Sequence, residues 1–265
     1  MTIANEKLLV TLENGIKRIT INRPERRNSV DRETIGLLRD AVKQSADDGT
    51  RVVILTGAGD SFCAGADLAA TNASDIANYD VTQAIRENVN PTILAIRALP
   101  IPVIARVHGH AVGVGHNYAL ACDMIIASEQ ALFGQVFVKI GLMPDGGSTF
   151  FLPRLVGYHK AFELMATGDI INAEEALKLG IVNRVVPFTE LDEVVDKTAS
   201  RLASMPQMAI AKIKAGINHG IDANLADSLE YEAVNQDACF HSQDFMEGVA
   251  AFIEKRKAVF GKSAG

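Results

Sequence analysis

The sequence predicts an α/β fold in which parallel strands alternate with helices, followed by a region made only of helices. Short apolar runs alternate with segments of helical spacing, and loops of small residues follow the runs. The unit of strand, small-residue loop and helix begins at Arg51, at Pro102 and, less clearly, at Ala131. From Phe188 onward the sequence shows only helical spacing. We therefore expect an α/β core over residues 1–187 and a helical region over residues 188–265.

The core is predicted to begin with a hairpin, a helix and a buried strand. Two β-prone runs flank Asn14-Gly15, which is the strongest short-range hairpin signal. Helical spacing then extends over residues 31–48, with the apolar residues on one side. The continuous apolar run over residues 51–56 predicts a strand buried on both faces, as in a parallel sheet.

The same pattern then recurs along the chain. A helix is predicted over about residues 74–98, and it ends before two prolines because proline disfavours a helical residue in front of it. The strand VIARV, the loop GHAVGVG, a helix over residues 117–122 and the strand DMIIAS follow. Four segments of the C-terminal region have helical spacing: residues 191–203, 207–217, 225–239 and 245–259.

Composition and charge exclude several classes of protein. The 265 residues include 26 Lys plus Arg and 32 Asp plus Glu, which gives a formal net charge of -6. This acidic balance argues against a nucleic-acid partner, which needs a basic face. The apolar segments are interrupted by arginine and proline and are shorter than a membrane span of about 20 residues. With no evident signal peptide, we expect a cytoplasmic protein without a membrane partner.

Cysteines and histidines predict neither disulfides nor a metal centre. Three cysteines lie far apart and form no C-x-x-C motif: Cys63, Cys122 and Cys239. We expect reduced thiols, and packing rather than nucleophilic attack for the first of them. Three histidines cluster in sequence without an accompanying set of acidic or Cys ligands: His108, His110 and His116. We expect these histidines to be structural or pocket-lining, with no metal bound.

Two loops of small residues lie where a strand ends and a helix begins, over residues 63–68 (CAGADL) and 113–117 (GVGHN). Neither matches a dinucleotide-binding, P-loop or nucleophile-elbow fingerprint. Such loops present free backbone N–H groups and the positive end of a helix dipole. Two of them facing each other would form an oxyanion hole. The alternative is that the glycines only allow helices to approach strands closely.

Five segments resemble the enoyl-CoA hydratase/isomerase (crotonase) superfamily, in that family's order and over nearly the whole chain. They are ITINRPERRNSVD, RVVILTGAGDSFCAGADL, IPVIARVHGHAVGVGHNYALACDMIIAS, ALFGQVFVKIGLMPDGGSTFFLPRLVG and EGVAAFIEKRKAVF. The resemblance implies a crotonase-like spiral of repeated ββα units. It also implies a homotrimer or a dimer of trimers, with the helical C-terminal region taking part.

The resemblance further implies an acyl-CoA thioester substrate and an oxyanion hole. In the family two backbone N–H groups hold the thioester oxygen, and the matching positions here are Ala66 and Val114. The family usually has glycine at the second position; valine keeps the N–H and narrows the approach. Proton removal beside a thioester makes an enolate, and losing one donor to its oxygen costs roughly 3–4 kcal/mol. Coenzyme A is part of the substrate, so no separate cofactor is expected.

The catalytic carboxylates depart from the family's hydratases. Asn117 and Phe137 stand where those enzymes have the two glutamates that deliver water, and neither side chain exchanges protons near neutral pH. Asp145 is a carboxylate that remains nearby. This combination is similar to the phenylacetate-pathway isomerases that act on ring-epoxidised phenylacetyl-CoA. One carboxylate with a raised pKa can move a proton from the α-carbon to the γ-carbon.

Two of these residues also have structural explanations. Asp145 could be a turn residue or the N-cap of the helix that follows. Asn117 could orient the substrate or a water, or be an ordinary inward residue of its helix.

Further residues are expected to bind the substrate. Arg26 and Arg27 match positions that contact the CoA phosphates or adenine. Phe252 and Lys255 match positions that reach CoA from the C-terminal helix of a neighbouring subunit. The alternative for both pairs is a solvated basic surface. The predicted substrate-binding set is completed by four residues: Ala64, Asp67, Leu68 and Phe137.

The leading hypothesis is an enoyl-CoA isomerase with Asp145 as acid and base. An enoyl-CoA hydratase using Asp145 or a substrate-held water is the second. An aromatic dehalogenase has weak support in a chain without tryptophan. A catalytically silent acyl-CoA-binding member is compatible with the missing glutamates. The acyl group is expected to depend on residues 70–93, where no motif constrains it.

Overall fold

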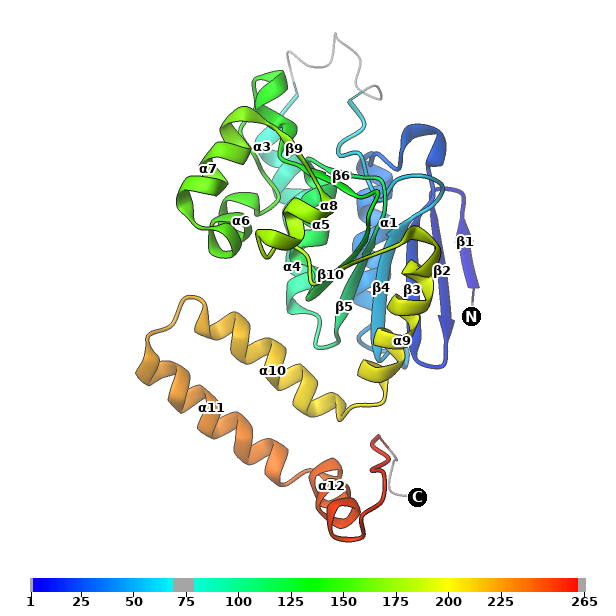
Figure 1. Ribbon diagram of the computed structural model, residues 1–265, viewed down its shortest axis with the longest axis vertical. Coiled ribbons are helices and arrows are strands. Elements are labelled where there is room, and N and C mark those ends of the chain that lie inside the picture. Colours follow the sequence, from blue (N-terminus) through cyan, green and yellow to red (C-terminus); the bar gives the residue numbers. More distant parts are fainter. Residues whose placement is uncertain (1, 69–78, 262–265) are drawn as a thin grey trace.

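Two β-sheets form the centre of the structure, a computed structural model that describes residues 2–68 and 79–261 (Figure 1). The large sheet contains, in order, β1 (Thr2–Asn5), β2 (Leu8–Glu13), β3 (Ile16–Ile21), β4 (Val52–Gly57), β5 (Val103–Val107), β7 (Met124–Ser128) and β10 (Arg184–Val186). The small sheet contains, in order, β6 (His110–Val112), β8 (Leu132–Gly134) and β9 (Ile170–Asn172).

The large sheet is parallel from β3 to β10 and antiparallel at its N-terminal edge. The predicted hairpin is β2 and β3, and its turn is Asn14 and Gly15, both at positive φ. The parallel strands predicted at β4, β5 and β7 are confirmed. The N-terminal hairpin makes the sheet mixed.

The helices follow the predicted pattern with shifted ends. They are α1 (Arg32–Gln44), α3 (Val81–Ala84), α4 (Asn90–Ala98), α5 (Val114–Ala121), α6 (Ser148–Val156), α7 (Tyr158–Thr167), α8 (Ala173–Lys178), α9 (Leu191–Ala203), α10 (Gln207–Gly220), α11 (Leu225–Phe240) and α12 (Gln243–Ile253). A π-helical turn (Ile85–Val89) joins α3 to α4. The helix predicted over 74–98 begins at Val81, where Asp80 caps it by accepting from the Gln83 N–H. Residues 74–78 lie outside the described part of the chain.

The predicted ββα repeat is present and brings the two small-residue loops together. In the units β5-β6-α5 and β7-β8-α6, the first strand joins the large sheet and the second joins the small one. The chain after β4 also turns from the large sheet toward the small one, as the pairing of Cys63 with Ala111 of β6 shows. Consecutive units therefore place the loop after β4 beside the loop after β6.

Both faces of the large sheet are buried, which explains the continuous apolar run in β4. Val53 and Leu55 face the core cluster that includes α1 and α4. Val52 and Ile54 face the opposite way, against the apolar side of α9. Alternate side chains of a strand point to opposite faces, so a strand covered by helices on both faces needs apolar residues throughout.

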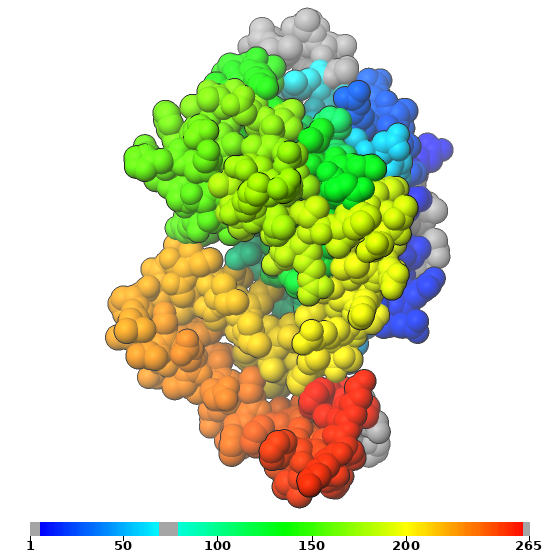
Figure 2. Space-filling view, viewed as in Figure 1, coloured from blue at the N-terminus to red at the C-terminus, as the bar shows by residue number. Residues whose placement is uncertain are grey.

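The C-terminal helices divide into one that packs on the sheet and three that leave it. Helix α9 packs on β4, β5 and β7, whereas α10–α12 project from the rest of the chain (Figures 1 and 2). Lys214, in the middle of α10, ties this helix to the rest of the chain by donating to Asp123 (2.8 Å) and to the main-chain oxygen of Ile96 (3.0 Å). The domain division at residue 188 stays a prediction. No helix among the described residues is long and apolar enough to cross a membrane.

Candidate active site

The first predicted donor, Ala66, lies in a segment paired with the chain before α1. The Val30 N–H donates to the main-chain oxygen of Gly65 (2.8 Å), and the Asp67 N–H donates to that of Val30 (3.0 Å). In a trans peptide the C=O and the N–H point in opposite directions, so the Ala66 N–H points away from Val30. It donates to none of the described residues. This N–H is therefore available to an acceptor from outside.

The second predicted donor, Val114, is the first residue of α5. Gly113 before it has a φ of 57°, in the region that favours glycine. The first N–H groups of a helix have no partner within it, and that of Val114 donates to none of the described residues. The helix dipole adds an attraction for negative charge at this end.

The two loops touch each other. A Cβ added to Gly65 would lie 3.1 Å from the main-chain oxygen of Val112 and 3.9 Å from the Cα of Gly113. Gly65 also has a φ of 97°, so its conformation and its space both favour glycine. The ring of Phe137 lies 3.9 Å from the position of a Cβ on Gly113. The structure therefore brings together both predicted donor loops and Phe137.

Asp145 lies in the turn before α6, next to the start of α5. A Cβ added to Gly146 would lie 3.3 Å from Nδ2 of Asn117 and 3.5 Å from Cγ2 of Val114. The Oδ1 atom of Asp145 is buried and has no hydrogen-bond partner among the described residues. Burial disfavours a charged carboxylate and raises the pKa of Asp145 above its usual range.

The carboxylate of Asp145 does not cap α6. Gly147 is the N-cap residue, and no side chain caps the helix. Instead, the main-chain oxygen of Asp145 accepts from the N–H and the hydroxyl of Ser148, both at 3.2 Å. The N-cap expectation for the Asp145 side chain is wrong, and its carboxylate has no such structural task.

Asn117 holds the Asp145 turn in place. Its Nδ2 donates to the main-chain oxygen of Asp145 (2.8 Å), and its Oδ1 accepts from Nε2 of Gln135 (2.7 Å). The same Gln135 nitrogen lies 3.2 Å from Nδ1 of His116. Burial lowers the pKa of His116 to about 4, so this ring is neutral at pH 7 and its Nδ1 can accept. These contacts support a positioning role for Asn117; its direct part in catalysis stays a prediction.

The other residues predicted in the first loop have separate positions. The Ala64 N–H donates to the main-chain oxygen of Arg27 (3.0 Å), and the carboxylate of Asp67 accepts from Nη2 of Arg23 (2.7 Å). Leu68 is 57% exposed, at the last described position before residue 79. The contact of Asp67 supports its loop.

The predicted CoA-binding residues lie in two separate parts of the chain. Arg26 and Arg27 are exposed in the segment beside the first loop. Phe252 is 85% exposed in α12, and Lys255 is exposed just after it. Figure 1 shows α12 at the opposite end of the molecule from β6 and α5. One copy of the chain does not bring the two pairs together.

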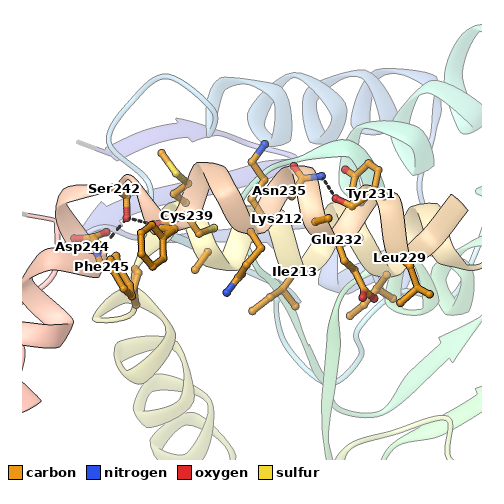
Figure 3. A pocket seen from close by; sticks show the side chains of 18 residues that line it. Lys212, Ile213, Leu229, Tyr231, Glu232, Asn235, Cys239, Ser242, Asp244 and Phe245 are labelled. Atoms are coloured by element: carbon orange, nitrogen blue, oxygen red, sulfur yellow. Dashed lines mark hydrogen bonds between the residues drawn. The ribbon is translucent and has the colours of Figure 1, made fainter. Parts of the chain in front are cut away.

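Two cavities lie outside this group of residues. A groove of about 890 Å³ lies on α10–α12, with Ile213, Leu229 and Phe245 among its lining (Figure 3). A smaller cavity of about 250 Å³ lies between α6, β7 and α10. Neither contains Asp145 or the two donor loops. The stretch expected to select the acyl group, residues 70–93, lies partly outside the described residues.

The thiol at the start of the first loop is buried. Cys63 is fully buried, and burial raises the pKa of its thiol to about 12, so it is protonated at neutral pH. In residues 2–68 and 79–261, no three His, Cys, Asp or Glu side chains group where they could hold a metal ion.

Sequence reasoning missed Gln135 and Arg23. Each contacts a predicted residue that is 18 or 44 positions away along the chain. For Gln135, the signal in the sequence was a polar glutamine within the otherwise apolar segment LFGQV. The second stands in NRPERR, where only the following arginines drew attention.

Comparison with known proteins bears on the whole chain. The family described as enoyl-CoA hydratase/isomerase matches residues 11–263. Crotonyl-CoA hydratase of Syntrophomonas wolfei is 39% identical over 260 residues, which cover 97% of this chain and 99% of that protein. The 1,2-epoxyphenylacetyl-CoA isomerase of Escherichia coli is 37% identical, with 96% and 98% covered.

A solved structure shows the same agreement in three dimensions. The crystal structure of enoyl-CoA hydratase from Bacillus anthracis superposes with a TM-score of 0.89 at 35% identity, covering 96% of this chain and 98% of that one. The match extends over the ββα units and the helical region alike. The chain therefore belongs to the enoyl-CoA hydratase/isomerase (crotonase) family and has its fold.

Proposed function

We propose that this protein is an enoyl-CoA isomerase that moves a double bond within an acyl-CoA thioester. The thioester oxygen accepts hydrogen bonds from the N–H groups of Ala66 and Val114. Asp145 takes the α-proton of a β,γ-unsaturated thioester, and the electron pair of the broken C–H bond passes into an enolate. Asp145 then returns the proton to the γ-carbon, which gives the conjugated α,β-unsaturated product. These steps need no redox cofactor or metal, because the substrate neither gains nor loses electrons and the proton taken from the α-carbon is returned to the γ-carbon.

One observation carries this proposal: Asp145 has a buried carboxylate oxygen that finds no hydrogen-bond partner in the described part of the chain, beside the start of α5. Burial raises its pKa toward the range where a carboxylate both accepts and returns a proton. Asn117 and Phe137 offer no second carboxylate. A reaction that needs one acid–base group fits this set better than one that needs two.

An enoyl-CoA hydratase is the second candidate. The relatives described above include hydratases as well as an isomerase. In this case Asp145 would act on a water held beside the double bond. Both candidates use the same oxyanion hole. They differ in whether water is added to the carbon chain of the substrate.

We further propose a homotrimer or a dimer of trimers in which α12 of one copy meets the CoA of another. Phe252 and Lys255 are exposed and far from the donor loops of their own chain. An acidic chain needs local cations for the CoA phosphates, and Arg26, Arg27 and Lys255 would supply them. Binding through exposed cations weakens as salt is added.

The experiment is incubation with a 3-enoyl-CoA in deuterated water, followed by absorbance and mass spectrometry. An isomerase produces the conjugated 2-enoyl-CoA, which absorbs in the near ultraviolet. Asp145→Asn and Asp145→Ala should both lose this activity by about 10²-fold or more. The second variant is included because Asp145→Asn creates an Asn-Gly pair, which can revert by deamidation.

The outcomes separate the candidates. Conjugation without gain of water supports the isomerase, whereas loss of conjugation and a gain of one water from a 2-enoyl-CoA at a comparable rate supports the hydratase. Full activity in both Asp145 variants rules out the mechanism above. Tight binding of several acyl-CoA thioesters without any turnover would indicate a binding protein.

A further inference from the structure

The segment that carries Ala66 is held by a short ladder to the chain before α1. Its rungs are Ala64 N–H to Arg27 oxygen (3.0 Å), Val30 N–H to Gly65 oxygen (2.8 Å) and Asp67 N–H to Val30 oxygen (3.0 Å). The last two rungs fix the peptides on either side of Ala66. The direction of the Ala66 N–H therefore depends on how firmly the two segments stay in register.

Arg23 bridges the two segments of this ladder. Its Nη1 donates to the main-chain oxygen of Ser29 on one segment (2.5 Å), and its Nη2 donates to Oδ2 of Asp67 on the other (2.7 Å). The side chains of Arg23 and Asp67 are only 12% and 5% exposed. A guanidinium is planar and donates from a rigid fork, so it fixes both the spacing and the angle between the segments.

The surrounding contacts hold Arg23 itself. Its own N–H donates to Oδ1 of Asn28 (2.9 Å), whose Nδ2 donates to the main-chain oxygens of Ala58 and Ser61 after β4. Asp31, the N-cap residue of α1, lies 3.6 Å from Nη2 of Arg23. The main chain of Arg23 is thus tied through Asn28 to the segment after β4, and its guanidinium lies beside the N-cap residue of α1.

We propose that the Arg23–Asp67 ion pair positions the Ala66 N–H for the thioester oxygen, which makes Arg23 a positioning residue of the oxyanion hole. This inference rests on the proposed function, because it assigns the Ala66 N–H to a thioester. Arg23 does not touch the reacting atoms. It acts by keeping one donor aimed, and aim matters because a misplacement of about 1 Å can slow a reaction about 10²-fold.

The test uses a ground-state probe that reports on the donors without turnover. The probe is 2,4-hexadienoyl-CoA, whose absorption moves to longer wavelength when its thioester oxygen accepts stronger hydrogen bonds. The variants are Arg23→Lys, which keeps the charge and loses the fork, and Asp67→Asn, which keeps the side-chain shape and loses the charge. Arg51→Lys is the matched control: Arg51 is half-buried and donates to the main-chain oxygens of Ala203 and Met205.

We expect the parent protein and Arg51→Lys to show the full wavelength shift, and Arg23→Lys and Asp67→Asn to lose at least half of it. In the isomerase assay their kcat should fall about tenfold or more with KM nearly unchanged. The double variant should be about as impaired as the more impaired single variant, since both substitutions break the same contact between Arg23 and Asp67. If Arg23→Lys fails to fold, Asp67→Asn carries the same test.

Three results would overturn the inference. A parent protein that binds the probe without any shift removes the oxyanion hole and the proposed function together with it. A full shift in the parent that Arg23→Lys and Asp67→Asn both retain leaves the proposed function intact and removes only the role of Arg23. Loss of heat stability with an unchanged shift and unchanged kcat likewise reduces the ion pair to a structural contact.

Discussion

At the scale of single residues, Asp145 combines a fixed main chain with a carboxylate oxygen that no described residue contacts by a hydrogen bond. Its main-chain oxygen accepts from Nδ2 of Asn117 (2.8 Å) and from the N–H and hydroxyl of Ser148 (3.2 Å each). Its Oδ1 is buried without a partner among the described residues. A backbone held this firmly keeps the carboxylate in one place, and a carboxylate without a protein donor is a stronger base than one that is hydrogen-bonded.

Asp145→Asn should remove the activity without lowering stability. Burial raises the pKa of Asp145 in the folded protein, so the folded state holds this proton to a higher pH than the unfolded chain does. The folded state therefore loses stability as pH rises from about 3.8 through the raised pKa. We expect the free energy of unfolding of Asp145→Asn at pH 7 to equal or exceed that of the parent, measured by urea titration at pH 7.

The same pKa sets the acid side of the rate profile. The active form is the carboxylate, so kcat/KM should fall as pH drops through the raised pKa of Asp145, at a higher pH than an exposed aspartate would give. If Asp145→Asn lowers the free energy of unfolding at pH 7 by more than about 1 kcal/mol, the usual contribution of a hydrogen bond, then the Asp145 carboxylate does have a partner in the folded chain, contrary to the description above.

Asn117→Ala should slow the reaction by loosening Asp145. The substitution removes the donor to the Asp145 main-chain oxygen and leaves Gln135 without one of its acceptors, which should lower the free energy of unfolding by about 1–3 kcal/mol. We expect kcat to fall about tenfold or more, with KM for the acyl-CoA little changed. Asn183→Ala is the control, because Asn183 also fixes the main chain, by accepting from the Ile125 N–H (2.7 Å), away from the site. Equal losses of kcat in both variants would contradict the positioning role.

At the scale of elements, the spacing of apolar residues was enough to predict the bounds of a helix where one face of that helix packs on the sheet. The predicted span of α9 agrees with the structure because Leu191, Val195 and Ala199 recur every four residues and all are buried. The start of α5 was predicted three residues late, because Val114, Gly115 and His116 read as loop and no polar N-cap marks the helix. The strands of the small sheet have three residues each, too short to show an alternation.

Leu191→Ala tests whether α9 is part of the core. The Leu191 side chain is fully buried against β4 and β5, so its truncation should lower the free energy of unfolding by about 2–5 kcal/mol. Leu177→Ala in α8 is the control, since this leucine is 42% exposed and should change stability by about 0.5 kcal/mol or less. Urea unfolding followed by circular dichroism measures both. Equal effects would show that α9 is only loosely attached.

At the scale of the whole molecule, the sequence predicted which chemical groups are present better than how they are held. The donor loops and Asp145 follow from segments that resemble the family. Their supports, Arg23 and Gln135, join elements that are distant along the chain, and no local spacing marks such a pairing. The same limit applies to α10–α12, whose helices were predicted but whose direction away from the sheet was not.

The apolar surface of α10–α12 provides the last prediction. Ile213 and Leu229 line the groove of Figure 3 and are 58% and 55% exposed, and a single chain leaves them in water. Contiguous apolar surface of this kind marks an association site. We expect sedimentation velocity to show three or six copies of the 28.4 kDa chain.

Charged residues in this groove should then separate assembly from folding. Ile213→Glu and Leu229→Glu should give folded chains that no longer associate, because the positions are exposed in one copy and a buried unpaired charge is costly in the assembly. If Phe252 and Lys255 reach the CoA of a second copy, the dissociated variants should also have a higher KM for acyl-CoA, and they should still convert the 3-enoyl-CoA to the conjugated product at high substrate concentration. Leu177→Glu, an equivalent change on α8, should leave assembly and KM unchanged. A parent protein that sediments as a single chain would show that this groove serves another purpose.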